Sequence, residues 1–237
     1  TKSVDDGATF SAPHEITDTF RAFSFEWTRL ASGPGHGIRL QRGPHRERMI
    51  VPVWMSDGSG TEFGPGKLGH RPSSVACVYS DDGGQTWQCG EFVARTDAPT
   101  AAGARIVNPS ETVAVELSDG RVLFNIRSEA RENRRLVSIS ADGAHRWSRP
   151  RFDRALLEPV CMASILRLEQ RGPDQRRLLS AAIGRVDSGT PDDNTFFKVA
   201  ASLAWPAQKL QFLDGRFSRD MDAWVGIDAT FESYEQD

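Results

Sequence analysis

An eight-residue pattern recurs along the chain and constrains its fold more than any other feature. Residues 80–87 have the form Ser-x-Asp-x-Gly-x-Thr-Trp, and residues 3–10 match this form with Phe in place of Trp. Residues 140–147 keep the Ser, the Asp and the Trp, and residues 202–206 hold a shortened copy. The copies begin at residues 3, 80, 140 and 202, and a pattern repeated at such a spacing indicates one supersecondary unit for each copy.

The residue types of this pattern predict a tight turn between two strands. The Asp carboxylate accepts backbone N–H groups across such a turn, and the Gly permits a positive φ. The hydroxyl groups of Ser and Thr close the loop, and the aromatic residue anchors it to a sheet. Because these roles are structural, we expect Asp5, Asp82 and Asp142 to shape turns and to take no part in catalysis.

Short runs of alternating apolar and polar residues lie between the turns, without a long helical pattern. These runs cover residues 49–55, 74–80, 112–117, 121–127, 135–140 and 162–168. Many short strands bounded by turn residues predict an all-β protein, either a sandwich, a barrel or a propeller. The repeat favours the propeller, with one four-stranded blade for each copy.

Composition excludes several classes of protein. The 237-residue chain has 29 Lys and Arg against 32 Asp and Glu, which argues against a nucleic-acid or membrane-surface protein. No apolar run approaches the roughly 20 residues that span a bilayer. The Cys and His residues lack zinc-ligand spacing, so neither a metal nor another cofactor is expected. The cysteines are expected to be small buried side chains, with their disulfide status open: Cys77, Cys89 and Cys161.

The eight-residue pattern resembles the Asp-box, or BNR repeat, of the sialidase (neuraminidase) superfamily. Three further stretches resemble bacterial-type exo-α-sialidases: the glycine-rich residues 33–38, the strand within residues 43–53, and residues 108–127. The resemblance covers residues 3 to about 180 and is patchy afterwards. It implies a single domain over residues 1–237 that forms a six-bladed β-propeller. We expect about four to five blades, with the chain truncated at its N-terminus, because the first Asp-box begins at Ser3.

The resemblance also implies a central site for sialic acid. In the family, three arginines bind the carboxylate, a tyrosine attacks the anomeric carbon, a glutamate takes the tyrosine's proton, and an aspartic acid serves as acid/base. Guanidinium groups suit bidentate carboxylate binding, and a phenol needs a nearby base to become a nucleophile. Glu111 matches the glutamate, Arg127 matches the second arginine sixteen residues later, and Asn125 shares the strand face of Arg127.

The loop between the two strands decides whether Glu111 and Arg127 meet. A two-residue hairpin at Asp119 and Gly120 pairs Thr112 with Arg127 and puts Glu111 on the opposite face. A three-residue loop, or a Glu111 that lies beyond the paired region, brings the two side chains together. A nearby basic cluster is expected in a solvated loop and consists of Arg131, Arg134 and Arg135.

Several positions depart from the family pattern. The first arginine and the acid/base aspartate belong upstream of Ser3, and residues 192–194 occupy the place of the third arginine, with Arg185 as the nearest substitute. Phe217 stands at the nucleophile position, where a Tyr is expected. Tyr234 is either the fallback nucleophile or a packing residue. The sequence therefore predicts an incomplete active site.

Two functions follow from these residues. The first is an exo-α-sialidase, a glycoside hydrolase that removes terminal sialic acid from glycoconjugates, although this chain alone is expected to have an incomplete active site. The alternative is a non-catalytic sialidase-like propeller that binds acidic glycans or serves as an Asp-box scaffold for interactions. Phe217 and the missing third arginine favour this alternative. For partners we expect a sialylated glycan and a monomeric state, and the resemblance favours a secreted or periplasmic protein.

Overall fold

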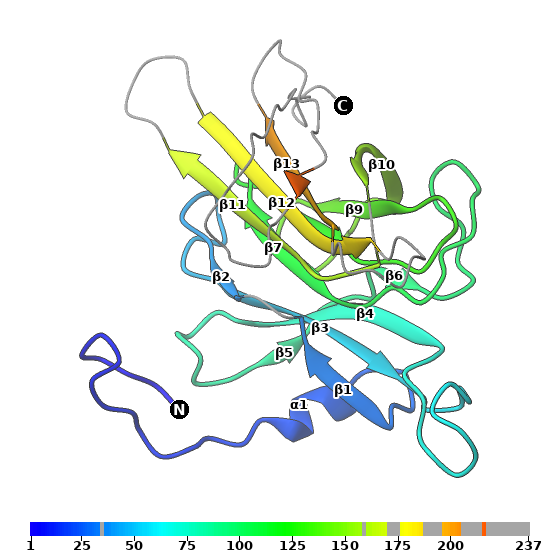
Figure 1. The fold of residues 1–237 in the computed structure, drawn as a ribbon. Helices are drawn as coiled ribbons and strands as arrows, with labels where there is room; N and C mark the ends of the chain where they lie inside the picture. The colour runs from blue at the N-terminus through cyan, green and yellow to red at the C-terminus, as the bar shows by residue number, and fades with distance from the viewer. Residues whose placement is uncertain (34–35, 158–159, 170–175, 187–195, 205–214, 217–237) are drawn as a thin grey trace.

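Antiparallel strands make up nearly all of the regular structure (Figure 1). The computed structural model describes residues 1–33, 36–157, 160–169, 176–186, 196–204 and 215–216. Within these ranges the one helix is α1 (Thr17–Arg21), which precedes the first strand. The predicted all-β class is confirmed.

The first sheet has six strands that follow the path of a four-stranded meander, because each outer strand is interrupted. Its strands are β1 (Arg29–Ser32), β2 (Ile38–Arg39), β3 (Met49–Ser56), β4 (Ser73–Ser80), β5 (Gln88–Cys89) and β6 (Ala94–Arg95). β1 and β2 pair one after the other with β3, and β5 and β6 do the same with β4. Both interruptions begin at a glycine, Gly33 or Gly90, where the absence of a side chain permits a close approach to a neighbouring chain.

The second and third sheets are uninterrupted meanders in chain order. The second consists of β7 (Thr112–Glu116), β8 (Val122–Ile126), β9 (Arg134–Ser140) and β10 (Arg151–Leu157). The third consists of β11 (Ala163–Glu169), β12 (Arg176–Val186), β13 (Phe196–Ala204) and β14 (Gly215–Arg216). The six runs of alternating residues coincide with β3, β4, β7, β8, β9 and β11, so these sequence predictions are confirmed.

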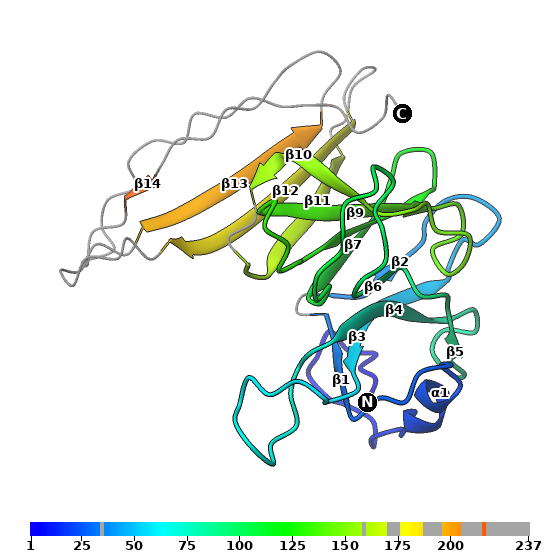
Figure 2. The same ribbon diagram turned by 90° about the vertical axis from the view of Figure 1, so that its right-hand side faces the viewer.

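The three sheets stack on one another, and β7 of the second sheet lies between the other two. β7 contacts β2 and β3 on one side and β11 on the other, and Figures 1 and 2 show the stack from two directions. Buried apolar residues such as Ile50 and Phe124 fill the space between the first two sheets. Leu123 and Ile165 belong to a smaller cluster between the second and third sheets.

Consecutive four-stranded meanders that stack on one another are typical of propeller blades. The described strands form three such sheets and do not close into a ring. The six-bladed propeller therefore stays a prediction, as does the extent of the domain.

The Asp-boxes form turns, as their residue types predict. Ser80 ends β4 and its hydroxyl donates to the Asp82 carboxylate at 2.8 Å, while the N–H and hydroxyl of Thr86 donate to the same group. These bonds hold the pKa of Asp82 well below its usual range, and the two bonds from Thr86 have the largest effect. The other two boxes have the same Ser-to-Asp bond, at 2.8 Å from Ser3 and 3.0 Å from Ser140. The three carboxylates thus stabilise turns.

Candidate active site

A three-residue loop joins β7 to β8 and sets the register of the two strands. The N–H of Leu117 donates to the carbonyl of Arg121 at 2.7 Å, which leaves residues 118–120 as the loop. Thr112 accordingly pairs with Ile126, and the next pair outward is Glu111 with Arg127, whose N–H donates to the Glu111 carbonyl at 2.9 Å. The two side chains therefore share one face of the sheet. Of the two registers that the sequence allows, the structure has the one that brings them together.

Glu111 and Arg127 form an ion pair that is only partly exposed. Nη1 of Arg127 lies 3.4 Å from Oε2 of Glu111, and the side chains are 23% and 29% exposed, respectively. Nη1 also donates to the Ser110 hydroxyl at 3.4 Å. The Nε of Arg127 is buried and has no hydrogen-bond partner among the described residues. The guanidinium therefore has one donor that no described residue uses, and it lies beside a carboxylate.

A second carboxylate and a second guanidinium extend this pair. Oε1 of Glu129 lies 3.8 Å from Nη2 of Arg127, and Oε2 of Glu129 accepts from Nε of Arg71 at 2.8 Å. Asn108 Nδ2 donates to the same Oε2 at 2.8 Å. Sequence reasoning missed both charged residues. Glu129 could have been found from the sequence, because residues two apart in an extended chain point to the same face and Glu129 follows Arg127 by two. Arg71 comes from the distant loop between β3 and β4, and no local pattern indicates its contact.

Asn125 and Arg135 form a buried polar pair next to this cluster. Asn125 is 1% exposed, and its side-chain oxygen accepts from Nε of Arg135, which is itself fully buried. Arg135 also donates to the carbonyls of Cys161 at 2.9 Å and of Glu111 at 3.4 Å. Placing Arg134 and Arg135 in a solvated loop was wrong, because both lie in β9 and Arg135 donates to interior oxygens. Arg131 is exposed and lies outside the strands, as expected. A contact between Asn125 and substrate stays a prediction.

The glycine-rich segment brings the first sheet against the start of β7. The N–H of Gly33 donates to the carbonyl of Pro52 at 2.9 Å, and a Cβ on Gly33 would overlap the carbonyl oxygen of Thr112. Thr112 follows Glu111 directly, so this close approach borders the ion pair. Only a residue without a side chain fits between the two backbones.

The remaining predicted site residues lie at or beyond the edge of the described structure. Arg185 lies in β12, where its backbone pairs with Phe197, and its side chain is outside the described part. Phe217 and Tyr234 fall outside the described residues, as do residues 192–194. Their roles stay predictions.

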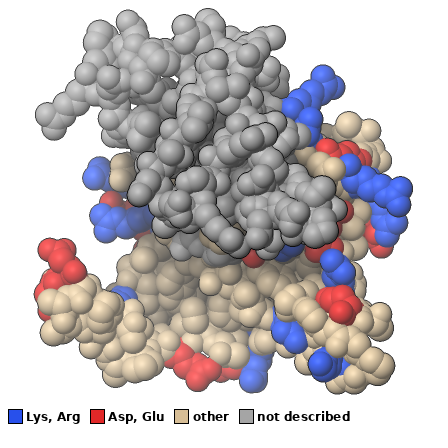
Figure 3. All heavy atoms as spheres, in the orientation of Figure 1, with Lys and Arg blue, Asp and Glu red and all other residues tan. Residues whose placement is uncertain are grey.

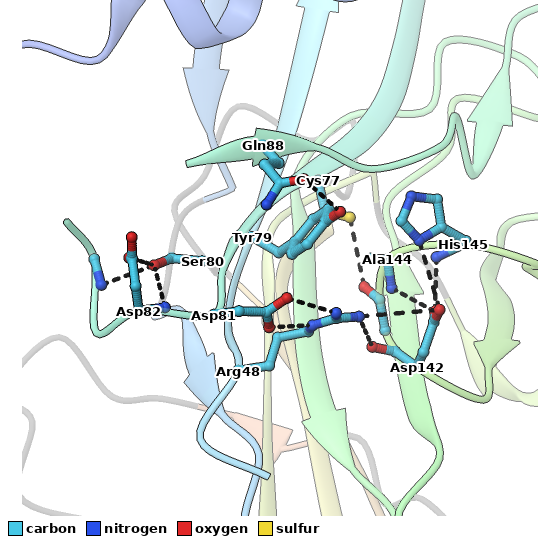
Figure 4. Close-up of polar contacts among 12 residues, drawn as sticks. Arg48, Cys77, Tyr79, Ser80, Asp81, Asp82, Gln88, Asp142, Ala144 and His145 are labelled. Atoms are coloured by element: carbon cyan, nitrogen blue, oxygen red, sulfur yellow. Dashed lines mark hydrogen bonds and ion pairs between the residues drawn. The ribbon is translucent and has the colours of Figure 1, made fainter. Parts of the chain in front are cut away.

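The opposite end of the sheets, where the Asp-boxes lie, is held by Arg48 (Figure 4). Its Nε and Nη2 bind the two oxygens of Asp81 at 2.7 and 2.8 Å, and Nη1 donates to the carbonyl of Asp142 at 3.2 Å. Bonding to Asp81 raises the pKa of Arg48 above its usual value. The guanidinium also lies over the ring of Tyr79, 4.5 Å from its centroid. Arg48 therefore ties the box of the first sheet to that of the second.

Tyr79 and Cys77 have structural roles, because both are buried and hydrogen-bonded within the protein. Tyr79 is 7% exposed, and its hydroxyl donates to Gln88 Oε1 at 3.1 Å. Cys77 is fully buried, and its thiol donates to the Gly143 carbonyl at 3.5 Å. Burial raises the pKa of both groups. Cys77 is the small buried side chain that was expected, Cys89 and Cys161 are half-buried, and all three are free thiols.

Other features of the described residues do not point to a different site. They contain no cluster of three metal-ligating side chains and no helix with the length and apolar character to span a bilayer. An open cavity of about 540 Å³ lies beside β1 and is lined by residues such as Trp27 and Trp54, and neither Glu111 nor Arg127 is part of its lining. Acidic and basic side chains are interspersed over the visible described surface (Figure 3).

Comparison with known proteins places these features in a family. The sequence model of the BNR repeat-like domain matches residues 1–169. A sialidase of Micromonospora viridifaciens is 36% identical over 141 residues, which cover 60% of this chain and 18% of that protein. A sialidase of Bacteroides fragilis is 31% identical over 171 residues, which cover 72% of this chain and 26% of that protein.

A solved structure shares the fold. The Hadza microbial sialidase Hz136 superposes with a TM-score of 0.59 at 24% identity, over 86% of this chain and 34% of that one. The chain thus spans between about a fifth and a third of the length of the proteins it matches. These matches confirm the predicted resemblance to bacterial-type sialidases.

Proposed function

This chain belongs to the family of BNR repeat-like domains, and from that membership we propose that it acts as a sialidase, a glycoside hydrolase that removes terminal sialic acid from glycoconjugates. Its similarity to sialidases of two bacteria supports this proposal. We further propose that the three sheets are consecutive blades of a six-bladed propeller, in one domain over residues 1–237.

The observation that carries the proposal is the opposition of Glu111 and Arg127 on one sheet face. The carboxylate of sialic acid is attached to the reacting carbon, so a guanidinium that binds it fixes that carbon in place. The Arg127 side chain is 23% exposed and thus not fully buried, as a guanidinium that receives a ligand must be. Ser110 and Glu111 hold the Nη1 side of the same guanidinium.

Glu111 would act as the base. A phenol with a pKa near 10 is a weak nucleophile until a neighbouring group takes its proton. A neutral phenol also suits a substrate that carries its own negative charge next to the reacting carbon, and sialidases are the glycosidases that use one. Phe217, at the aligned nucleophile position, has no hydroxyl, which leaves Tyr234 as the candidate nucleophile of this chain.

Hydrolysis of a fluorogenic sialoside by this chain tests the proposal. If the chain turns the substrate over, the rate should fall roughly 100-fold or more in Glu111→Gln, because general-base catalysis contributes about that much. Arg105→Ala, which removes an exposed ion pair with Asp97, is the control and should keep the wild-type rate. Absence of turnover together with Arg127-dependent binding of sialic acid would favour the non-catalytic propeller. Absence of both turnover and binding would contradict the proposal.

A further inference from the structure

We propose that Glu129 is a specificity-determining residue that weakens the binding of anions at Arg127. This inference rests on the proposed function, in which Arg127 receives the carboxylate of the substrate. Glu129 would act as an internal carboxylate that already faces the guanidinium and repels an incoming one.

The chain fixes Glu129 beside Arg127. Its N–H donates to the carbonyl of Val107 at 2.9 Å, and the intervening Ser128, 1% exposed, donates its hydroxyl to the same carbonyl. The Glu129 side chain is 20% exposed, so water screens its charge only partly. The position of this carboxylate is therefore set by backbone pairing and by its own hydrogen bonds.

The two oxygens of Glu129 have different partners. Oε2 accepts from both Arg71 and Asn108 at 2.8 Å, whereas Oε1 lies 3.8 Å from Nη2 of Arg127. Nη1 of Arg127 lies near Glu111, so both terminal nitrogens of this guanidinium face a carboxylate of the protein. The cluster of Arg71, Glu111, Arg127 and Glu129 pairs two positive with two negative charges, so the two carboxylates reduce the attraction of the guanidinium groups for an anion.

A ligand carboxylate that approaches the Nη2 edge of Arg127 meets the Oε1 of Glu129. Two like charges a few ångströms apart in a half-buried site repel each other strongly enough to change affinity by roughly threefold to thirtyfold. Arg71 has the opposite effect. Its bond to Oε2 partly neutralises the charge of Glu129 and holds the carboxylate towards Arg71. Loss of Arg71 should therefore increase the repulsion.

Two substitutions separate this role from simple support of Arg127. Glu129→Gln removes the charge and keeps an oxygen for Arg71, and it should tighten the binding of an anionic sugar by roughly threefold to thirtyfold. Arg71→Gln should weaken binding by a similar factor, and the double variant should bind like Glu129→Gln. A residue that only supports Arg127 would weaken binding when changed.

The test is titration of the whole chain with N-acetylneuraminic acid, followed by calorimetry or NMR, for the wild type and these variants. Glu91→Gln is the control for net charge, since Glu91 accepts the N–H of Arg146 in the third Asp-box, away from Arg127. Tighter binding by Glu129→Gln and weaker binding by Arg71→Gln, with an unchanged control, supports the inference. Measurable binding that is unchanged or weaker in Glu129→Gln overturns it and leaves the proposed function intact. No saturable binding by any variant overturns the proposed function and the inference together.

Discussion

Arg127 faces Glu111 across the first two strands of the second sheet, with Nη1 3.4 Å from Oε2. This relationship depends on the three-residue loop at residues 118–120, because a loop one residue shorter would turn Glu111 to the opposite face. The close passage of Gly33 beside Thr112 holds the first sheet against the same point. One end of two neighbouring sheets is thereby arranged around a guanidinium and a carboxylate.

Loss of the Arg48 guanidinium should separate the two Asp-boxes that it joins. Arg48→Met keeps the apolar stem against Tyr79 but removes the bonds to Asp81 and Asp142, and we expect the free energy of unfolding to fall by about 2–4 kcal/mol. The loss stays below that of a fully buried pair because Asp81 is 48% exposed. Urea denaturation measures the change.

The matched control for Arg48 is Arg39→Met. Arg39 and Glu47 form an ion pair at 3.1 Å with side chains that are 66% and 53% exposed. Exposed pairs contribute little, so this variant should lose less than about 1 kcal/mol. Equal losses for the two variants would contradict the role of Arg48 as a tie between sheets.

Acid should destabilise the protein in part through Asp142. Burial raises the pKa of Asp142, but bonds from the N–H groups of His145 and Ala144 and from the Ser140 hydroxyl outweigh it and lower the pKa from 3.8 to about 2. A carboxyl with a depressed pKa stabilises the folded state above pH 4, and this contribution of up to about 2 kcal/mol is lost as the pH falls from about 4 to 2.

Denaturation curves at pH 7, 4 and 2 test this dependence. Asp142→Asn should be less stable than the wild type at pH 7 and should lose less stability between pH 4 and pH 2. The exposed Asp18→Asn controls for net charge. A variant whose acid-induced loss equals that of the wild type would show that Asp142 does not contribute.

A side chain at Gly33 should disturb both folding and the candidate site. The Cβ of Gly33→Ala overlaps the Thr112 carbonyl, so β7 must shift at its start, and we expect a loss of about 1–3 kcal/mol together with weaker binding of sialic acid. Gly43→Ala is the comparison, because Gly43 has φ 71° and open space around it. Its cost should be about 1 kcal/mol, without effect on binding. If Gly33→Ala binds sialic acid as the wild type does, the close approach of Gly33 to Thr112 does not support the candidate site.

The local part of this structure could be predicted from sequence, and the long-range part could not. Alternation and turn residues located β3, β4, β7, β8, β9 and β11, since both signals act within a few residues. The sequence does not decide which face of the sheet carries Glu111, because a change of one residue in the length of the loop reverses that face. Arg135 was misplaced because arginine is usually solvated, whereas here Asn125 and interior carbonyls receive its donors. The contact of Arg71 with Glu129 joins residues 58 apart, which no local pattern reveals.

The most direct test of the site is the affinity of this chain for sialic acid compared with that for its methyl ester, which lacks the negative charge. If Arg127 receives the carboxylate, the wild type should bind the acid roughly tenfold or more tightly than the ester, because charge-assisted hydrogen bonds are worth about 1.5–3 kcal/mol. In Arg127→Ala this preference should vanish. Equal affinities for the acid and the ester, or a preference for the acid that survives in Arg127→Ala, would contradict the assignment of Arg127 and the proposed function built on it.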